Sequence, residues 1–280
     1  MTLKRSQVIQ AKRIVIKIGS AILTNNGNGL NAPLIASWVE QIGHLKAQGI
    51  EVVVVSSGAV AEGVVRQKLS QRPQSLAELQ AAAAIGQTGL IQAYQREFDR
   101  FALQTAQVLL VHDDVTCPDR YKNAMNTLRV LLDWSAVPIV NENDTVANEE
   151  LKFGDNDTLA AMVVNIINAD LLIILTDQQG MFDSDPRLHK EANLISTFNA
   201  CDETLLTMAG EGGALGRGGM NTKVKAAQLA ACNHAHTVIA SGEEQSVLQR
   251  VVSGEAIGTL LYSPEEGFEE RKAWFNSLRR

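Results

Sequence analysis

Two lysines stand beside glycine-containing segments in this chain. Lys17 ends a β-branched run, and Gly19 follows it closely. Lys223 follows a segment that contains Gly218 and Gly219. Transfer of a phosphoryl group requires positive charge on the migrating group, backbone N–H groups around the phosphates, and carboxylates that hold a metal. Because acidic and amide side chains cluster in further segments of the same kind, the sequence predicts phosphoryl-transfer chemistry.

These polar segments come directly after apolar runs or open predicted helices. In open α/β sheets, ligands bind beyond the carboxyl ends of the strands. The N–H groups at the start of a helix favour a carboxylate or a phosphate. The segments at such places are Lys17–Ser20, Ser56–Ala59, Asn141–Asp144, Gly154–Asp157, Thr176–Asp177 and Gly216–Lys223.

Other common nucleotide and nucleophile motifs are absent from the sequence or misplaced. No GxxxxGK[ST] segment occurs, which argues against a P-loop. The segment from Gly27 to Ala32 matches GxGxxA, but a dinucleotide fingerprint needs its first glycine immediately after the strand that ends at Ile18. We interpret it as an ordinary loop. None of the 5 histidines lies in a glycine-rich segment, so the sequence offers no obvious catalytic base.

Alternating strands and helices must position these segments. The predicted strands are Arg13–Ile18, Glu51–Val55, Thr105–Val111, Pro138–Asn141, Leu171–Leu175 and Ala235–Ala240. Several are apolar without alternation, as expected for central strands buried on both faces. The predicted helices are Asn31–Gly49, Ser75–Phe98, Asp119–Trp134, Asn156–Ile167 and Asn221–Cys232. This order predicts an α/β fold with an open, largely parallel sheet between helical layers, an α/β/α sandwich.

Composition narrows the class of protein. The chain has 280 residues, 45% of them hydrophobic, and a formal net charge of −6, so no nucleic-acid surface is expected. The 3 cysteines have no metal-site spacing. The basic start of the chain is not followed by an apolar stretch, and no apolar run approaches the ~20 residues of a membrane span. These features predict a cytoplasmic location and no membrane contact.

No linker or repeat divides the chain. We expect one continuous domain over residues 11–263, with terminal extensions at 1–10 and 264–280. The segment Gly180–Pro186 is expected to form a turn or small hairpin, and Glu265–Arg280 a loosely held tail.

Together the motifs resemble one family, the glutamate 5-kinases of the amino-acid kinase superfamily. The stretches that carry the resemblance are VIKIGSAIL, VVVVSSGAVAEG, AAIGQTGLIQAY, NTLRVLLDW, VPIVNENDTVA, FGDNDTLAAMVVNIINADLLIILTDQQGMFDSDPR, LGRGGMNTKVKAAQLA and IGTLLYS. They run in family order over nearly the whole chain. The pair NENDTVA and GDNDTLA is more specific than any nucleotide loop alone.

The resemblance implies ATP-dependent phosphorylation of the L-glutamate γ-carboxylate. The product would be γ-glutamyl phosphate, the first intermediate of proline biosynthesis. It further implies Mg²⁺ on the phosphates, feedback inhibition by proline, a homo-oligomer (dimer or tetramer), and a functional link to glutamyl phosphate reductase. A carboxylate is already ionised at pH 7, so the reaction needs no general base. Many family members carry a C-terminal PUA domain, and we expect this chain to be a short form without one.

The resemblance also assigns roles to residues, with no protein ligand to a metal. Lys17 and Lys223 would be catalytic, held in place by Asp157. The implied glutamate-binding residues are Ser57, Gly58, Ala59, Asp144 and Asn156. The implied ATP-binding residues are Lys17, Gly19, Thr176, Asp177, Arg217, Gly218, Gly219, Met220, Asn221, Thr222 and Lys223.

One departure and two alternatives accompany this interpretation. Arg217 stands where the family has threonine or another small residue. The first alternative is another kinase of the superfamily, acting on N-acetylglutamate or aspartate. The second is a non-catalytic amino-acid sensor with the same fold, which would require neither Lys17 nor Lys223.

Overall fold

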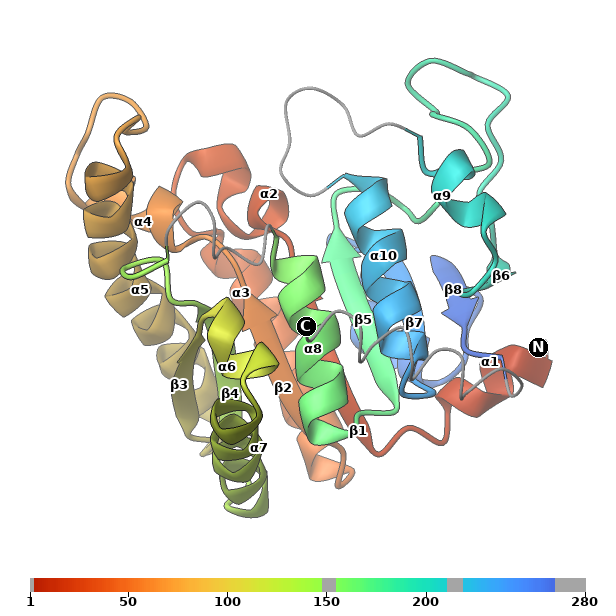
Figure 1. The fold of residues 1–280 in the computed structure, drawn as a ribbon, viewed down its shortest axis with the longest axis horizontal. Coiled ribbons are helices and arrows are strands. Elements are labelled where there is room, and N and C mark those ends of the chain that lie inside the picture. The colour runs from red at the N-terminus through yellow and green to blue at the C-terminus, as the bar shows by residue number, and fades with distance from the viewer. Residues whose placement is uncertain (1–2, 148–154, 211–218, 265–280) are drawn as a thin grey trace.

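The computed structural model describes residues 3–147, 155–210 and 219–264, and these form a single sheet covered by helices on both faces (Figure 1). The sheet has eight strands in the order β3-β4-β2-β1-β5-β7-β8-β6. Strands β1 to β5 run parallel to their neighbours, and β7 is parallel to β5, while β8 is antiparallel to β7 and parallel to β6. The predicted fold class, an α/β sandwich around a largely parallel sheet, is therefore confirmed.

Six of the eight strands were predicted. The strands are β1 (Arg13–Ile18), β2 (Glu51–Ser56), β3 (Thr105–Leu110), β4 (Val137–Glu142), β5 (Leu171–Thr176), β6 (Thr197–Asn199), β7 (His236–Ser241) and β8 (Thr259–Tyr262). The two that were not predicted, β6 and β8, are the shortest and form one edge of the sheet. The segment Gly180–Pro186, expected as a turn or small hairpin, begins a longer loop that an antiparallel bridge between Phe182 and Leu194 closes.

The five predicted helices are present, and six short α-helices accompany them within the described residues. The helices are α1 (Leu3–Val8), α2 (Ser20–Leu23), α3 (Ala32–Ala47), α4 (Ala59–Arg66), α5 (Leu76–Phe98), α6 (His112–Thr116), α7 (Pro118–Asp133), α8 (Asn156–Ile167), α9 (Thr204–Met208), α10 (Met220–Ala231) and α11 (Val247–Val252). The Asn31 side chain caps α3 by accepting from the Leu34 N–H at 3.3 Å. Gly49 follows the helix at a φ of +80°, which glycine adopts without strain.

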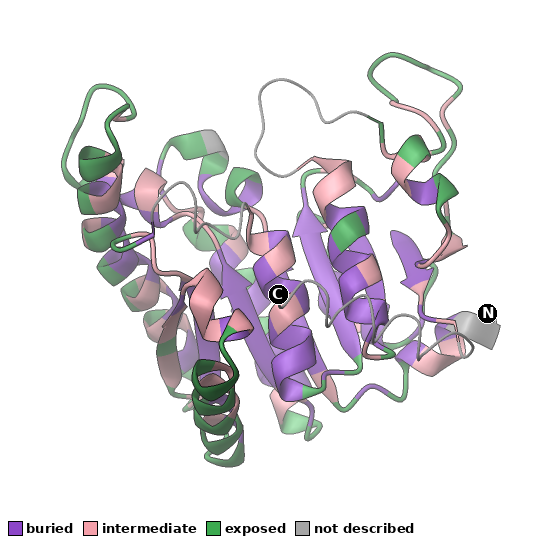
Figure 2. Cartoon of the chain, in the orientation of Figure 1, coloured by how far each residue is buried: buried purple, intermediate pink, exposed green. Residues whose placement is uncertain are grey.

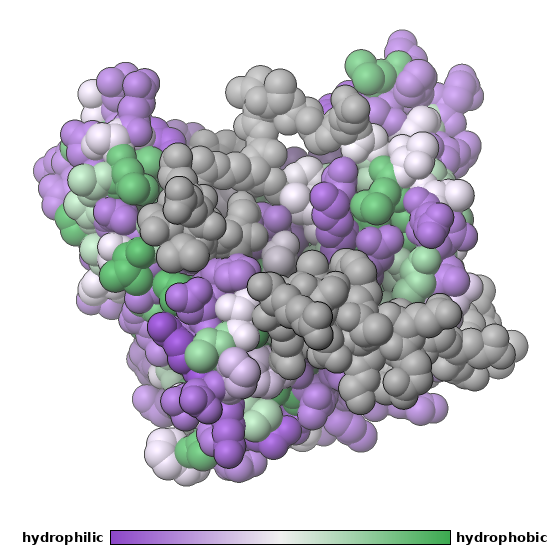
Figure 3. Space-filling view, in the orientation of Figure 1, coloured by the Kyte–Doolittle hydropathy of each residue, from purple (hydrophilic) through white to green (hydrophobic). Residues whose placement is uncertain are grey.

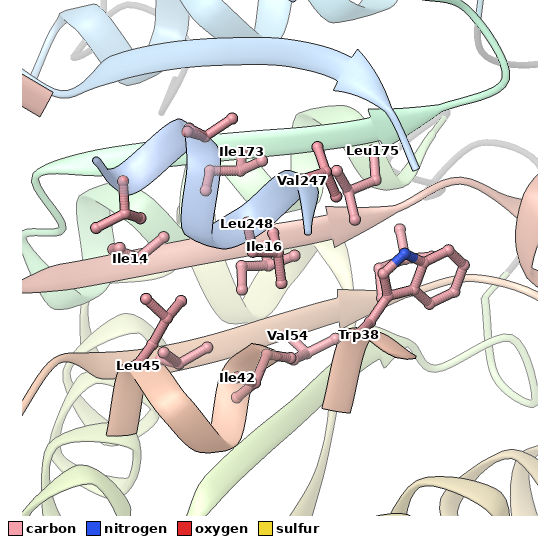
Figure 4. Packing of buried hydrophobic residues seen from close by; sticks show 14 of the residues in the cluster. Ile14, Ile16, Trp38, Ile42, Leu45, Val54, Ile173, Leu175, Val247 and Leu248 are labelled. Atoms are coloured by element: carbon pink, nitrogen blue, oxygen red, sulfur yellow. The ribbon is translucent and has the colours of Figure 1, made fainter. Parts of the chain in front are cut away.

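Side-chain alternation along the strands divides the core into two layers. On β1, Ile14, Ile16 and Ile18 pack with α3 and α11 on one face, the face seen in Figure 4. Val15 packs with α7, α8 and α10 on the other face. Successive strand residues point to opposite faces. The same alternation therefore carries the Lys17 side chain to the α8–α10 face.

The ends of β2 and β4 follow the same rule. Ser56 and Asn141 contact Tyr94 and Gln87, both on α5, which lies in the α3 layer. Ser57, one residue further along, contacts the start of α8 in the opposite layer. Both helical layers thus reach the same edge of the sheet, where the carboxyl ends of the parallel strands meet.

Glycines let α4 and α5 touch through their backbones. A Cβ on Gly63 would lie 1.8 Å from the Ala82 carbonyl oxygen, and one on Gly86 would lie 1.8 Å from that of Ala59. Ala59 is the first residue of α4, so this packing fixes where that helix starts relative to α5.

One face of the molecule shows how burial and polarity are distributed. The central strands β1, β2 and β5 are buried over almost their full length, and helices α8 and α10 carry buried residues where they cover the sheet (Figure 2). Figure 3 shows hydrophilic side chains over most of the coloured surface on this face, with hydrophobic residues in small groups. Within the described residues, no helix is both long and apolar enough to cross a membrane.

Candidate active site

The first part of the site is a buried charged cluster of Lys17, Asp157 and Lys223. The Lys17 Nζ lies 2.5 Å from Asp157 Oδ1, and the Lys223 Nζ lies 3.1 Å from Asp157 Oδ2. Asp157 is fully buried, and each lysine residue is 5% exposed. The three residues come from the end of β1 and from the first turns of α8 and α10. Two ammonium groups thus share one carboxylate, which leaves positive charge for an anionic ligand.

Local structure holds Asp157 in this position. Asp155 caps α8, and its Oδ1 accepts from the Thr158 N–H at 2.8 Å. The Thr222 hydroxyl lies 2.8 Å from Asp157 Oδ2 and 2.8 Å from the Gly219 carbonyl oxygen. Because a hydroxyl has one proton to donate, it serves one of these acceptors at a time. The start of α10 is thereby tied to the start of α8.

The charges in this cluster perturb one another. Burial by itself disfavours the Asp157 carboxylate, but Lys17 and Lys223 outweigh it and lower its pKa to about 2. Burial lowers the pKa of Lys223, and the nearby Lys17 adds to that effect while Asp157 opposes it. Burial and the Asp157 charge raise the pKa of Asp155. Such perturbed groups cluster at functional sites more often than elsewhere.

The backbone beside this cluster is closely packed. The Gly19 N–H donates to the Leu175 carbonyl at 3.0 Å, and a Cβ on Gly19 would lie 3.2 Å from the same oxygen. The Thr176 hydroxyl donates to Asp177 Oδ1 at 2.9 Å. The loop after β1 and the end of β5 therefore lie side by side next to Lys17.

The second part of the site is at the start of α4. Gly58 precedes α4 with a φ of +96°, a conformation that other residues adopt only with strain. A Cβ there would also lie 2.9 Å from Thr24 Cγ2. Glycine is therefore required for the chain to turn from β2 into the helix, where Ala59 is buried and Ser57 is half-buried.

An amide network joins Ser57 to the opposite helical layer. Asn156 Nδ2 donates to Ser57 Oγ at 2.7 Å and to Asn141 Oδ1 at 2.9 Å, with the Ser56 carbonyl oxygen at 3.3 Å. Asn141 Nδ2 in turn donates to Gln87 Oε1 on α5 at 2.9 Å. Asn156 immediately precedes Asp157, so the amide network and the charged cluster meet on the first turn of α8.

The remaining predicted residues divide into three groups. Asp144 is half-buried in the turn after β4, on the same edge of the sheet. Gly219, Met220, Asn221 and Thr222 lie at the start of α10, as predicted. Arg217 and Gly218 lie outside the described residues.

The sequence interpretation missed two members of the network, Gln87 and Asn141. Both are buried polar residues, at 6% and 2% exposure. Asn141 was noted only as part of a polar segment. A glutamine inside the alanine-rich stretch of α5 was the available signal for Gln87. Among the described residues, no group of three or more His, Cys, Asp or Glu side chains could hold a metal ion.

Known proteins of similar sequence show the family of this chain. A family model described as "Amino acid kinase family" matches residues 12–241. Glutamate 5-kinase of Saccharophagus degradans is 55% identical over 271 residues, which cover 97% of this chain and 73% of the relative. Glutamate 5-kinase of Acinetobacter baumannii is 54% identical over 265 residues, which cover 95% of this chain and 70% of the relative.

One solved structure shares the fold at low sequence identity. The crystal structure of UMP kinase from Bacillus anthracis matches with a TM-score of 0.62 and 16% identity. The match covers 90% of this chain and 96% of the other. At that identity the likeness bears on the fold alone.

Proposed function

The chain belongs to the amino acid kinase family and, within it, to the glutamate 5-kinases, and we propose from this that it transfers the γ-phosphoryl group of ATP to the side-chain carboxylate of L-glutamate. The product is γ-glutamyl phosphate, and the reaction is the first step of proline biosynthesis. The observation that carries the proposal is the Lys17–Asp157–Lys223 cluster, which adjoins the amide network through neighbouring residues of α8.

In the proposed reaction the lysines supply charge stabilisation. A glutamate γ-carboxylate oxygen attacks the γ-phosphorus of ATP, and the bond from that phosphorus to the bridging oxygen breaks to release ADP. Lys17 and Lys223 neutralise negative charge on the oxygens of the migrating group. Asp157 holds both ammonium groups at fixed positions and stays ionised at neutral pH, because its pKa is about 2.

Magnesium enters this scheme as part of the substrate, MgATP. Mg²⁺ in kinases is commonly held by one or two carboxylates together with the substrate phosphates, and it neutralises phosphate charge. Both Asp157 oxygens contact lysines, so Asp157 fits the role of a lysine anchor better than that of a metal ligand.

The amino-acid site is proposed at Ser57, Gly58, Ala59, Asp144 and Asn156. Ser57 Oγ accepts from Asn156, so its own proton can be donated to the α-carboxylate of glutamate. The first N–H groups of α4, after Gly58, favour the same carboxylate. Asp144 is the proposed acceptor for the α-ammonium group.

The nucleotide is proposed to lie over the ends of β1 and β5 and the start of α10. Gly19 lets the backbone approach the phosphates. The other proposed contacts are Thr176, Asp177, Arg217, Gly218, Gly219, Met220, Asn221 and Thr222, together with Lys17 and Lys223.

The test is ADP release in the presence of MgATP with one candidate acceptor at a time. We expect release with L-glutamate, a hydroxylamine-trapped γ-glutamyl product, and little release with aspartate or N-acetylglutamate. A preference for either of those acceptors would assign the chain to another kinase of the family. Glutamate binding without any ADP release would support the sensor alternative instead.

We propose that proline inhibits by occupying the glutamate site. Proline offers an α-carboxylate and an α-ammonium but no γ-carboxylate, so it would bind without reacting. Initial rates at several proline concentrations, with glutamate varied, should show inhibition that high glutamate relieves. Inhibition that glutamate does not relieve would contradict a shared site. Absence of inhibition would remove feedback control but leave the kinase function standing.

Several further expectations stay predictions. They are the domain limits of residues 11–263, a dimeric or tetrameric assembly, a link to glutamyl phosphate reductase, and a cytoplasmic location.

A further inference from the structure

Gln87 is a buried polar side chain behind the proposed amino-acid site. It lies on α5 in the layer opposite α8 and is only 6% exposed. Its Oε1 accepts from Asn141 Nδ2, whereas its Nε2 is buried without a hydrogen-bond partner among the described residues. An unpaired buried donor costs free energy. A glutamine at this position is therefore not explained by packing, for which methionine would serve as well.

The direction of hydrogen bonding in the network is fixed by the backbone. The Glu142 N–H, which can only donate, lies 2.9 Å from Asn141 Oδ1. That oxygen must therefore be an acceptor, and Asn141 must present Nδ2 to Gln87. Gln87 Oε1 accepts from this Nδ2 group. The Gln87 side chain and the Glu142 N–H therefore hold the Asn141 amide in a single orientation.

Asn141 passes this orientation to Asn156. Because Asn141 Oδ1 is an acceptor, Asn156 must present its donor Nδ2 to it, and that group also contacts Ser57. Asn156 Oδ1 makes no hydrogen bond within the described part of the chain and is left as an acceptor. Ser57, which accepts from Asn156, is left as a donor. The network thus ends in an acceptor and a donor, which suit an α-ammonium and an α-carboxylate.

We propose that Gln87 is a positioning residue for the amino-acid substrate, which acts through Asn141 to fix the amide orientation of Asn156 and the donor role of Ser57. This inference rests on the proposed function, because the substrate is taken to be an amino acid. Gln87 itself touches neither the substrate nor ATP. Its acceptor oxygen carries the effect, and its Nε2 is dispensable.

The experiment compares Gln87→Met with Gln87→Glu by steady-state kinetics. Methionine keeps the volume but removes the acceptor, so Asn141 loses the partner that holds it. We expect the KM for glutamate to rise about tenfold, the effect of one lost hydrogen bond of about 1.4 kcal/mol, with the KM for ATP changed less than about twofold. The Gln87→Glu variant keeps an acceptor oxygen in either protonation state, so its KM for the substrate glutamate should lie within about threefold of the wild-type value.

Gln92→Met is the matched control, since Gln92 lies on α5 like Gln87 and is exposed. Its side chain accepts a hydrogen bond from Arg66 and takes no part in the amide network. This variant should leave both KM values unchanged. The rise in melting temperature on adding glutamate provides a second readout that needs no turnover, and it should shrink in Gln87→Met alone.

The positioning role would be overturned if Gln87→Met raised the KM for glutamate and the KM for ATP equally. It would also be overturned if Gln87→Glu raised the KM for glutamate as much as Gln87→Met does. If Gln87→Met does not fold, a Gln87→Glu enzyme with near wild-type KM supports the acceptor role, and a weakened one refutes it. A wild-type protein that releases no ADP with glutamate would instead refute the proposed function.

Discussion

The charged cluster and the amide network begin at adjacent residues, Asp157 and Asn156, yet they are held together by different physics. In the cluster, two lysines contact one fully buried carboxylate at 2.5 and 3.1 Å. In the network, neutral amides are linked by hydrogen bonds of 2.7 to 2.9 Å that run from Ser57 to Gln87. Charge decides the first arrangement, and donor–acceptor direction decides the second.

The difference indicates a division of labour on one turn of α8. In a site from which water is excluded, charged side chains interact strongly with the phosphoryl group, whose charge distribution changes during transfer. Amides do not titrate, so they present the same donor and acceptor to an amino acid at any ordinary pH. Changes to the cluster should therefore affect kcat and the pH dependence. Changes to the network should affect the KM for glutamate.

The largest expected effect comes from removing a lysine. Lys17→Ala or Lys223→Ala should lower kcat by ~10²–10³, the range for loss of one preorganised charge-stabilising group. The KM for glutamate should change much less, because the amide network is left intact. Initial rates with glutamate and MgATP measure both values.

Lys225→Ala is the control for this prediction, because Lys225 lies on α10 with Lys223 but is exposed. It should keep wild-type kcat. Near wild-type turnover in a Lys17→Ala, Lys223→Ala double variant would remove the cluster from the mechanism and end the comparison.

Asp144 tests whether the amino-acid side also uses charge. Asp144→Ala should raise the KM for glutamate roughly 10- to 100-fold, the loss expected for a hydrogen bond to a charged group, and the KM for ATP far less. The exposed Asp133 offers a control carboxylate on α7. Equal effects on both substrates would place Asp144 with the metal or the nucleotide instead.

The fold was predictable from the sequence where hydrophobic runs are long. The central strands β1, β2 and β5 are buried over almost their full length, and such runs are unambiguous. The edge strands β6 and β8 have three and four residues. Segments that short take their conformation from pairing with a neighbour, here β8 with β7, which no local pattern in the sequence reveals.

The site was predictable where residues end strands or open helices. Lys17, Ser57 and Asp157 lie where the alternation of the strands and the cap of α8 place them. The contribution of Gln87 was not predictable, because it depends on how α5 crosses the ends of β2 and β4. That crossing is set by backbone contact at Gly63 and Gly86, a tertiary feature.

The pH dependence of stability should also distinguish the charged cluster from the amide network. The pKa of Asp157 is about 2 in the folded protein, below the ordinary value of 3.8. A lowered folded pKa stabilises the protein fully above the unfolded pKa, and this stabilisation is lost as pH falls from about 4 toward 2. The loss is about 2 kcal/mol at 1.36 kcal/mol per pKa unit. Denaturant unfolding at several pH values measures it.

Two variants make the acid prediction specific to the cluster. Asp157→Asn should lack this part of the acid-dependent loss, although it is less stable at neutral pH because two lysines then share no carboxylate. Gln87→Met should keep the wild-type pH slope, since the network contains no titrating group. The same slope in wild type and Asp157→Asn would contradict the lowered pKa.

The smallest expected effect on stability and kinetics comes from changing Tyr94, which contacts the end of β2 but is not part of the amide network. Its hydroxyl lies 3.1 Å from Ser56 Oγ, and its side chain is fully buried. Burial raises the pKa of Tyr94, so the contact stays a neutral hydrogen bond at all relevant pH values. Tyr94→Phe should reduce the free energy of unfolding by roughly 0.5–1.5 kcal/mol, the range for a neutral hydrogen bond. The Ser56 hydroxyl has a second acceptor, the Ser57 carbonyl oxygen at 3.3 Å, which favours the lower end.

The kinetic outcome of Tyr94→Phe distinguishes support of a strand from orientation of an amide. Tyr94 and Gln87 lie two turns apart on α5 and reach the same edge of the sheet. Only Gln87 bonds to an amide that contacts Asn156. The KM for glutamate should therefore change less than about twofold in Tyr94→Phe, against about tenfold in Gln87→Met. If the two variants raise that KM equally, α5 acts on the site as a packed unit, and the direction of the amides is not what sets the affinity for glutamate.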